Sequence, residues 1–193
     1  MIGVYIAAGV VGLLLIAFAV SYDRFVRQGN LIKDSWANVD TELRRRYDLI
    51  PNLVETVKGY AAHEKEIFEK LAQARADAIA QTGPPEAQAR AQSGVVSGLR
   101  QLLAVTENYP QLKASQNFLS LQNELTNTED RIQAARRFYN NNVRSYNTRV
   151  QSFPSNAIAG MFHFQMQQYF EIDEAVARAG APQVDLAPDT GTP

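Results

Sequence analysis

Residues 2–22 (IGVYIAAGVVGLLLIAFAVSY) form an uncharged, mostly apolar stretch near the start of the chain. At a helical rise of ~1.5 Å per residue, this stretch reaches about 31 Å, which is enough to cross the hydrocarbon core of a bilayer. A surface helix of a soluble protein would carry charged residues on one face, and this stretch carries none. We therefore predict a transmembrane helix over residues 2–22 that binds the lipid bilayer in a single-pass membrane protein.

A cleavable secretory signal is the competing interpretation, because residues 17–19 (AFA) have the small-x-small form of a cleavage site. The stretch is longer than the usual apolar core of a signal peptide, and no Lys or Arg precedes it, so we favour an anchor that is kept. Arg24, Arg27 and Lys33 follow it closely. By the positive-inside rule, the rest of the chain is expected on the cytoplasmic side.

Charge and composition limit what the rest of the chain can do. The 19 basic and 20 acidic side chains nearly balance, so no concentrated basic surface indicates nucleic-acid binding. The absence of cysteine excludes disulfides, thiolate metal sites and cysteine nucleophiles. We assign residues 1–22 to the anchor, 23–178 to one helical domain and 179–193 to a disordered tail, because this tail is rich in Pro, Gly and Asp.

Two long apolar series predict that the domain is all-α. Their residues recur at spacings of three and four, along one face of a helix, and no stretch alternates with the period of a strand. The first series contains Ile32, Trp36, Val39, Leu43, Tyr47, Ile50, Val54, Val57, Ala61, Phe68 and Leu71. The second contains Phe118, Leu121, Leu125, Thr128, Ile132, Ala135, Tyr139, Val143, Tyr146, Val150 and Phe153. Helices this long need partners along their length, so we predict an antiparallel up-and-down bundle.

Prolines divide the domain into helices. Pro51 lacks a backbone donor and is expected to kink the first apolar series near residues 47–50, whereas residues 83–85 (GPP) and Pro110 are expected to end helices. Ser115 is placed to cap the long helix that follows, and Ser155 or Asn156 to cap the last one. The predicted helices cover residues 24–50, 52–81, 86–107, 115–152 and 156–178.

The motifs that usually carry catalysis or metal binding are missing. Neither His63 nor His163 has a glutamate three residues before it, as a dinuclear carboxylate bundle requires. Residues 94–98 (GVVSG) lack the spacing of a nucleophile elbow and fall in a predicted helix, where Gly94 and Gly98 would let helices approach closely. We therefore predict a non-enzymatic protein with no catalytic residue, no metal ligand and no cofactor.

A stretch of 40 residues from Arg131 onward contains five arginines and no acidic side chain. On a helical wheel, Arg131, Arg136 and Arg149 flank the apolar stripe, where arginines usually pair with acidic residues of adjacent helices. Arg137 and Arg144 fall on the opposite face. They are candidates for contact with anionic headgroups or an acidic protein partner.

For three more segments, the sequence bears on whether the side chains are exposed or buried. Residues 44–46 (RRR) have acidic residues at helical ion-pair spacing, which favours a solvated, partly paired face. The asparagines that follow Tyr139 and Tyr146 would need hydrogen-bond partners if buried, and would then fix the register of the helices. After Pro154, large apolar residues crowd together and either close the end of the bundle or form an exposed patch for a partner or a bilayer. The candidate interaction residues there are Met161, Phe162 and Phe164.

Several blocks of the sequence resemble the bacterial LemA family. They are residues 43–64 (LRRRYDLIPNLVETVKGYAAHE), 107–113 (ENYPQLK), 135–140 (ARRFYN), 146–149 (YNTR) and 153–156 (FPSN). With the N-terminal span, the resemblance covers about residues 1–172, although His163 stands where the family tends to have glycine. The resemblance implies a single-pass anchored helical bundle on the cytoplasmic side, no established reaction, and a link to envelope quality control.

These observations predict a membrane-anchored helical scaffold or adaptor that acts through protein–protein contacts and can self-associate into a homo-oligomer. The alternative is a secreted or periplasmic helical bundle that binds lipid or a small ligand.

Overall fold

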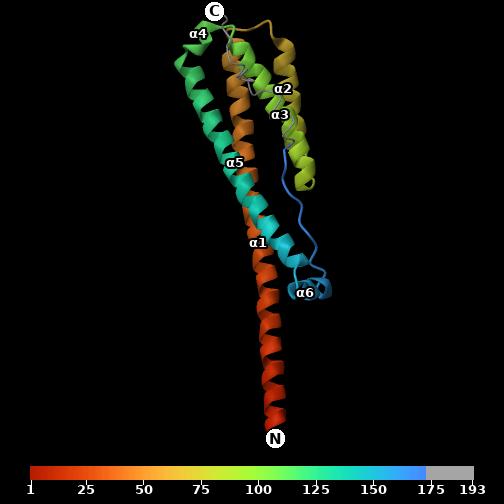
Figure 1. The fold of residues 1–193 in the computed structure, drawn as a ribbon. Helices are drawn as coiled ribbons and strands as arrows, with labels where there is room; N and C mark the ends of the chain where they lie inside the picture. Colours follow the sequence, from red (N-terminus) through yellow and green to blue (C-terminus); the bar gives the residue numbers. More distant parts are fainter. Residues whose placement is uncertain (173–193) are drawn as a thin grey trace, which may run out of the picture.

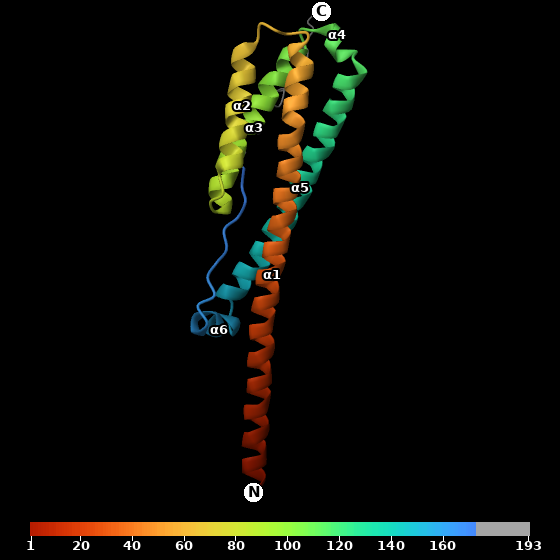
Figure 2. The same cartoon turned by 180° about the vertical axis from the view of Figure 1, so that it is seen from behind.

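The computed structural model describes residues 1–172, and all regular secondary structure in that part is helical. The helices are α1 (Ile2–Lys58), α2 (Lys65–Ala80), α3 (Pro85–Thr106), α4 (Pro110–Lys113), α5 (Gln116–Gln151) and α6 (Ser155–Met161). The four long helices α1, α2, α3 and α5 run alternately up and down, which confirms the predicted antiparallel bundle (Figures 1 and 2). The predicted helix over 173–178 and the tail over 179–193 lie outside the described residues.

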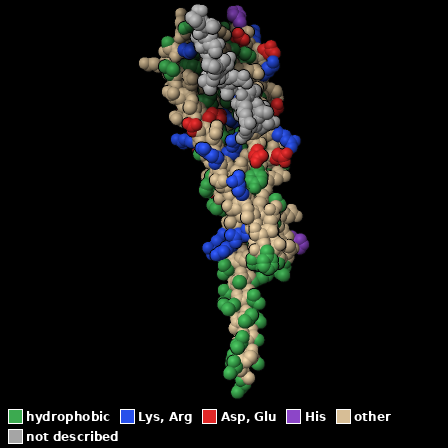
Figure 3. All heavy atoms as spheres, in the orientation of Figure 1, with side chains coloured by type: hydrophobic (Ala, Val, Ile, Leu, Met, Phe, Trp, Pro, Cys, Tyr) green, Lys and Arg blue, Asp and Glu red, His purple; other side chains and the backbone are tan. Residues whose placement is uncertain are grey.

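The first third of α1 extends below the bundle with no other helix beside it (Figure 1). An 18-residue window near its N-terminus has a mean hydropathy of 2.5, and none of that window is buried. Hydrophobic side chains surround this stalk (Figure 3). By length and composition, α1 can cross a membrane, as the sequence predicts.

Pro51 lies inside α1, which continues to Lys58, so the predicted division between helices 24–50 and 52–81 is wrong. Proline cannot donate the hydrogen bond that the carbonyl oxygen of Tyr47 would accept. Arg75 of α2 takes that place and donates from Nε to the Tyr47 oxygen at 2.7 Å. The helix survives because another helix satisfies the orphaned carbonyl.

The first helix break falls instead between Lys58 and Lys65. The Val57 carbonyl there accepts hydrogen bonds from the backbone N–H groups of both Tyr60 and Ala61, at 3.0 and 2.9 Å. Ala61 is 1% exposed, so the turn is fixed by burial as well as by hydrogen bonds. The hydrophobic series runs through this turn without losing its spacing, which is why periodicity alone did not reveal it.

The core lies mainly between α1 and α5 and between α2 and α3. Members of both predicted apolar series fill it, but Phe153, the last residue of the second series, is 86% exposed. The close helix approach expected at Gly98 is confirmed, because a Cβ atom there would lie 3.0 Å from Leu71 Cδ1. At Gly94 the nearest atom would be Ala74 Cβ at 3.5 Å, an ordinary contact.

The last predicted helix, over 156–178, is also wrong in its extent. α6 ends at Met161, and residues 164–172 follow without helical structure, returning along the bundle (Figures 1 and 2). Between them, His163 has a φ of 57°. Glycine adopts this left-handed conformation at the least cost, so the position favours glycine although histidine occupies it.

Candidate functional site: an arginine-lined groove

Two asparagines of α5 hold residues 164–172 against the bundle through backbone hydrogen bonds. Asn147 donates from Nδ2 to the carbonyl of Gln167 at 2.9 Å and accepts from the N–H of the same residue at 2.8 Å. Asn140 makes the same pair with Phe170, at 3.1 and 2.9 Å. Asn140 and Asn147 therefore find the partners that the sequence required, in an extended segment that the sequence did not predict. Asn141 is exposed, and the buried Nδ2 of Asn142 has no hydrogen-bond partner among residues 1–172.

The spacing of these contacts follows from the geometry of the two elements. Asn140 and Asn147 are two helical turns apart, about 10.5 Å along the axis of α5. Gln167 and Phe170 are three residues apart, about 10 Å in an extended chain. The two repeats match in length, so each asparagine lies opposite one of these residues. The hydrogen bonds show that the N–H and C=O of both residues face α5.

Aromatic contacts bury the same segment. Phe170 is 0% exposed and packs edge-on against Trp36 of α1, with ring centroids 5.3 Å apart. The Tyr139 hydroxyl donates to the carbonyl of Gln168 at 2.8 Å. Burial raises the pKa of Tyr139 to about 12, so the hydroxyl keeps its proton and remains a donor at neutral pH.

A groove of about 1170 Å³ lies beside this segment, between α3 and α5. Its basic residues from α5 are Arg136, Arg137 and Arg144. We call it the arginine groove; its other lining residues are Glu86, Arg90, Ser93, Asn140, Asn141 and residues 168–172. The structure thus brings the predicted pair Arg137 and Arg144 into one site, and adds Arg136 from the same helix.

The three α5 arginines of the groove have no ion pair with any residue in 1–172. Arg137 and Arg144 are exposed, and Arg136 is half-buried. Arg90, from α3, differs because it pairs with Glu86 one turn away. Glu171 also lines the groove, so the lining holds four arginines against two glutamates and keeps a net positive charge. Several basic side chains are visible together in the middle of the bundle (Figure 3).

The expectation that flanking arginines pair with acidic residues fails in the described structure. Arg149 donates from Nε to the amide oxygen of Gln28 at 2.8 Å and lies 5.9 Å from the centre of the Phe25 ring. Arg131 is exposed without an acidic partner in residues 1–172. The stem of Arg149 packs as predicted, but its partners are an amide and an aromatic ring.

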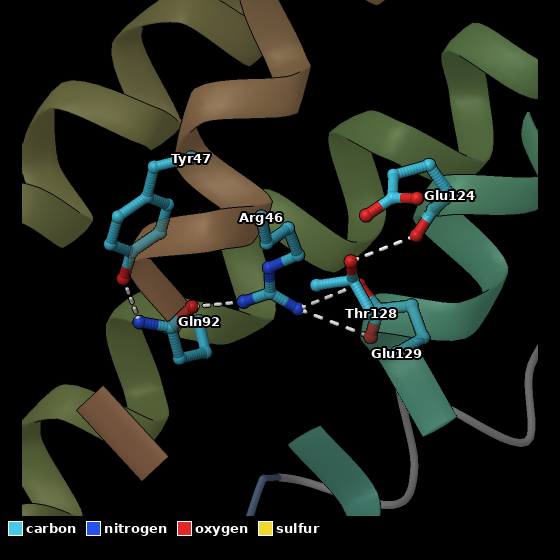
Figure 4. Close-up of polar contacts among 6 residues, drawn as sticks. All are labelled: Arg46, Tyr47, Gln92, Glu124, Thr128 and Glu129. Atoms are coloured by element: carbon cyan, nitrogen blue, oxygen red, sulfur yellow. Dashed lines mark hydrogen bonds and ion pairs between the residues drawn. The ribbon is translucent and has the colours of Figure 1, made fainter. Parts of the chain in front are cut away.

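Arg46 occupies a buried polar network that the sequence reasoning missed (Figure 4). It is 0% exposed and donates from Nη1 to both carboxylate oxygens of Glu129, at 3.1 and 3.3 Å. Its Nη2 donates to Gln92, which in turn donates to the Tyr47 hydroxyl. The network joins α1, α3 and α5 in the core.

The prediction of a solvated face over residues 44–46 is therefore right for Arg44 and Arg45 and wrong for Arg46. Arg44 pairs with Asp40 at 2.8 Å, and Arg45 lies 3.7 Å from Glu42. Arg46 lies three residues after Leu43 and four before Ile50, so it shares their buried stripe. That spacing was the signal available in the sequence.

The apolar candidates Met161, Phe162 and Phe164 divide between two environments. Phe164 is half-buried and stacks on Phe25 of α1 at 4.8 Å, so it closes the base of the bundle. Met161 and Phe162 remain 65% and 42% exposed. Among residues 1–172, no group of three or more His, Asp or Glu side chains is arranged to hold a metal ion.

The amino-acid sequence is similar to those of several known bacterial proteins. Magnetosome protein MamQ 2 of Paramagnetospirillum magneticum is 26% identical over 175 residues, which cover 78% of this chain and 64% of that protein. Protein LemA of Metamycoplasma hominis is 25% identical over 169 residues, covering 85% and 75%. Magnetosome protein MamQ of Magnetospirillum gryphiswaldense is 25% identical over 187 residues, covering 82% and 69%. The LemA family matches residues 35–186, and the chain belongs to this family.

Proposed function

We propose that this protein is a membrane-anchored, non-enzymatic adaptor whose arginine groove binds an acidic segment of a partner protein. The observation that carries the proposal is the set of three α5 arginines, Arg136, Arg137 and Arg144, which line one groove without an ion pair in residues 1–172. Guanidinium groups bind carboxylates through paired hydrogen bonds, so acidic side chains are the chemical group that suits this surface.

The form of the groove suits a peptide. Its volume of about 1170 Å³ leaves room for a short peptide segment. One wall is itself an extended chain, residues 168–172. A second extended segment can lie along that wall while its carboxylates reach the arginines.

The proposal is tested with the full chain in detergent and a fluorescent ten-residue peptide that alternates glutamate with apolar residues. We expect the peptide to bind, and its affinity to fall with added salt because exposed charges are screened. Exchanging Arg137 and Arg144 for glutamine should weaken binding about tenfold, equivalent to ~1.4 kcal/mol. Fluorescence anisotropy measures both effects.

Lys33 and Arg131 provide the matched control. Both are exposed and lie outside the groove, and exchanging both for glutamine changes the net charge equally. This variant should bind the peptide as the unmodified chain does. Equal weakening by both double variants would show a general charge effect and would contradict a specific groove.

The side of the membrane forms the second part of the proposal. Arg24, Arg27 and Lys33 follow the apolar span, and basic residues next to a span favour the cytoplasmic side. We expect protease added outside intact bacterial spheroplasts to leave the bundle whole, and to digest it after lysis. Digestion of the bundle in intact spheroplasts would favour the periplasmic alternative.

A further inference from the structure

α6 lies beside α1 at the height where the apolar span ends. The ring of Phe162 lies 4.7 Å from Tyr22 and 5.8 Å from Phe18, between ring centroids. Phe18 and Tyr22 form the last turn of the uncharged stretch, and Asp23 follows directly. Both views place α6 where the part of α1 without neighbouring helices begins (Figures 1 and 2).

The chain around α6 presents large apolar side chains that the described part of the protein leaves uncovered. We call residues 153–166 the α6 corner. Phe153 is 86% exposed, Met161 65%, Met166 53% and Phe162 42%. Water would contact all four if the corner lay in solution, which is unfavourable for apolar surface.

The height of the corner identifies what covers it. The headgroup layer on each side of the hydrocarbon core is about 5–7 Å thick. If residues 2–22 fill the core, then a ring packed between Phe18 and Tyr22 lies at the boundary of core and headgroups. Trp and Tyr side chains gather at this boundary in membrane proteins, because their rings are partly polar and partly apolar, and Tyr22 fits that pattern.

We propose that the α6 corner is a second membrane contact, in which Met161 and Phe162 enter the bilayer surface beside the end of the α1 span. This inference rests on the membrane anchor of the proposed function but does not depend on what the arginine groove binds. The two contacts together hold the base of the bundle at the headgroups at two points.

The chain contains no cysteine, so a single introduced cysteine can be labelled without side reactions. The full chain is reconstituted into phosphatidylcholine–phosphatidylglycerol vesicles, with a nitroxide spin label at Met161→Cys. Paramagnetic resonance then compares collisions with oxygen, which concentrates in lipid, and with a water-soluble nickel complex. We expect oxygen collisions to dominate at this site.

Two control sites make the result decisive. A label at Phe138→Cys, 49% exposed on α5 and outside the α6 corner, should collide mainly with the nickel complex. A label at Val11→Cys, 55% exposed in the middle of the span, should collide mainly with oxygen. The ratio of oxygen to nickel collisions at Met161 should exceed that at Phe138 severalfold.

The outcomes separate this inference from the anchor itself. If the label at Val11 lies in lipid while that at Met161 collides mainly with nickel, the second contact is absent and the anchor stands. If the label at Met161 is immobile and reached by neither reagent, protein covers the corner and the inference is also wrong. If the label at Val11 is in water, both the anchor and the second contact fail.

Discussion

Replacement of Arg46 by alanine is expected to lower the free energy of unfolding by about 3 kcal/mol. The substitution leaves a cavity where a fully buried side chain was, and it removes the donor that satisfies the buried amide oxygen of Gln92. Glu129 contributes less to the loss, because its side chain is 35% exposed and can turn to water. Denaturant unfolding of the full chain in mild detergent, followed by circular dichroism, measures the change.

The adjacent residue supplies the control for this prediction. Arg45 sits in the same run of arginines and pairs weakly with Glu42, but its side chain is 41% exposed. Its replacement by alanine should change the free energy of unfolding by less than about 0.5 kcal/mol. If the replacement of Arg46 costs as little as the replacement of Arg45, the buried network adds nothing to stability.

Replacing both Asn140 and Asn147 by alanine is expected to release residues 164–172 from α5. Four hydrogen bonds between these side chains and the backbone of the segment disappear, and each contributes ~0.5–1.5 kcal/mol. We expect amide hydrogen exchange at Gln167 and Phe170 to become about 100-fold faster, which corresponds to ~2.7 kcal/mol of local opening. Nuclear magnetic resonance of the labelled chain resolves these two amides.

Asn141 offers the comparison for that experiment. Asn141 lies between Tyr139 and Tyr146 in the sequence, as Asn140 does. It is exposed, and its side chain makes no hydrogen bond with residues 1–172. Its replacement by alanine should leave the exchange rates of both amides unchanged. Unchanged rates in the double asparagine variant would show instead that the burial of Phe170 alone holds the segment.

The sequence predicts this fold well wherever the physical signal is local. Apolar spacing of three and four places the core of α1 and α5, and residues 83–85 and Pro110 end helices as expected. The span over residues 2–22 follows from length and charge alone. Each of these signals depends only on residues that are close in sequence, so tertiary contacts need not be known to interpret it.

The errors arise where a distant residue decides the outcome. Pro51 stays within a helix because Arg75, from another helix, donates to the carbonyl that proline orphans. Residues 164–172 remain extended because asparagines some twenty and thirty positions earlier bind their backbone. Neither partner can be identified from local propensity.

The arginine groove was also predictable only in part. Helical angles alone placed Arg137 and Arg144 on one face away from the apolar stripe, and both line the groove. That face becomes a groove only because α3 and the extended segment stand beside it. The charges could therefore be predicted from the sequence, whereas the enclosure could not.

The unbroken course of α1 through Pro51 makes the bundle a lever attached to the lipid. From Tyr22 to Lys58 the helix rises about 54 Å without a joint. Transmembrane helices adopt tilts of ~0–40°, and a change of ~10° would sweep the far tip of this lever sideways by about 9 Å. Bilayer thickness can in this way set how far from the lipid, and in which direction, the upper loops reach.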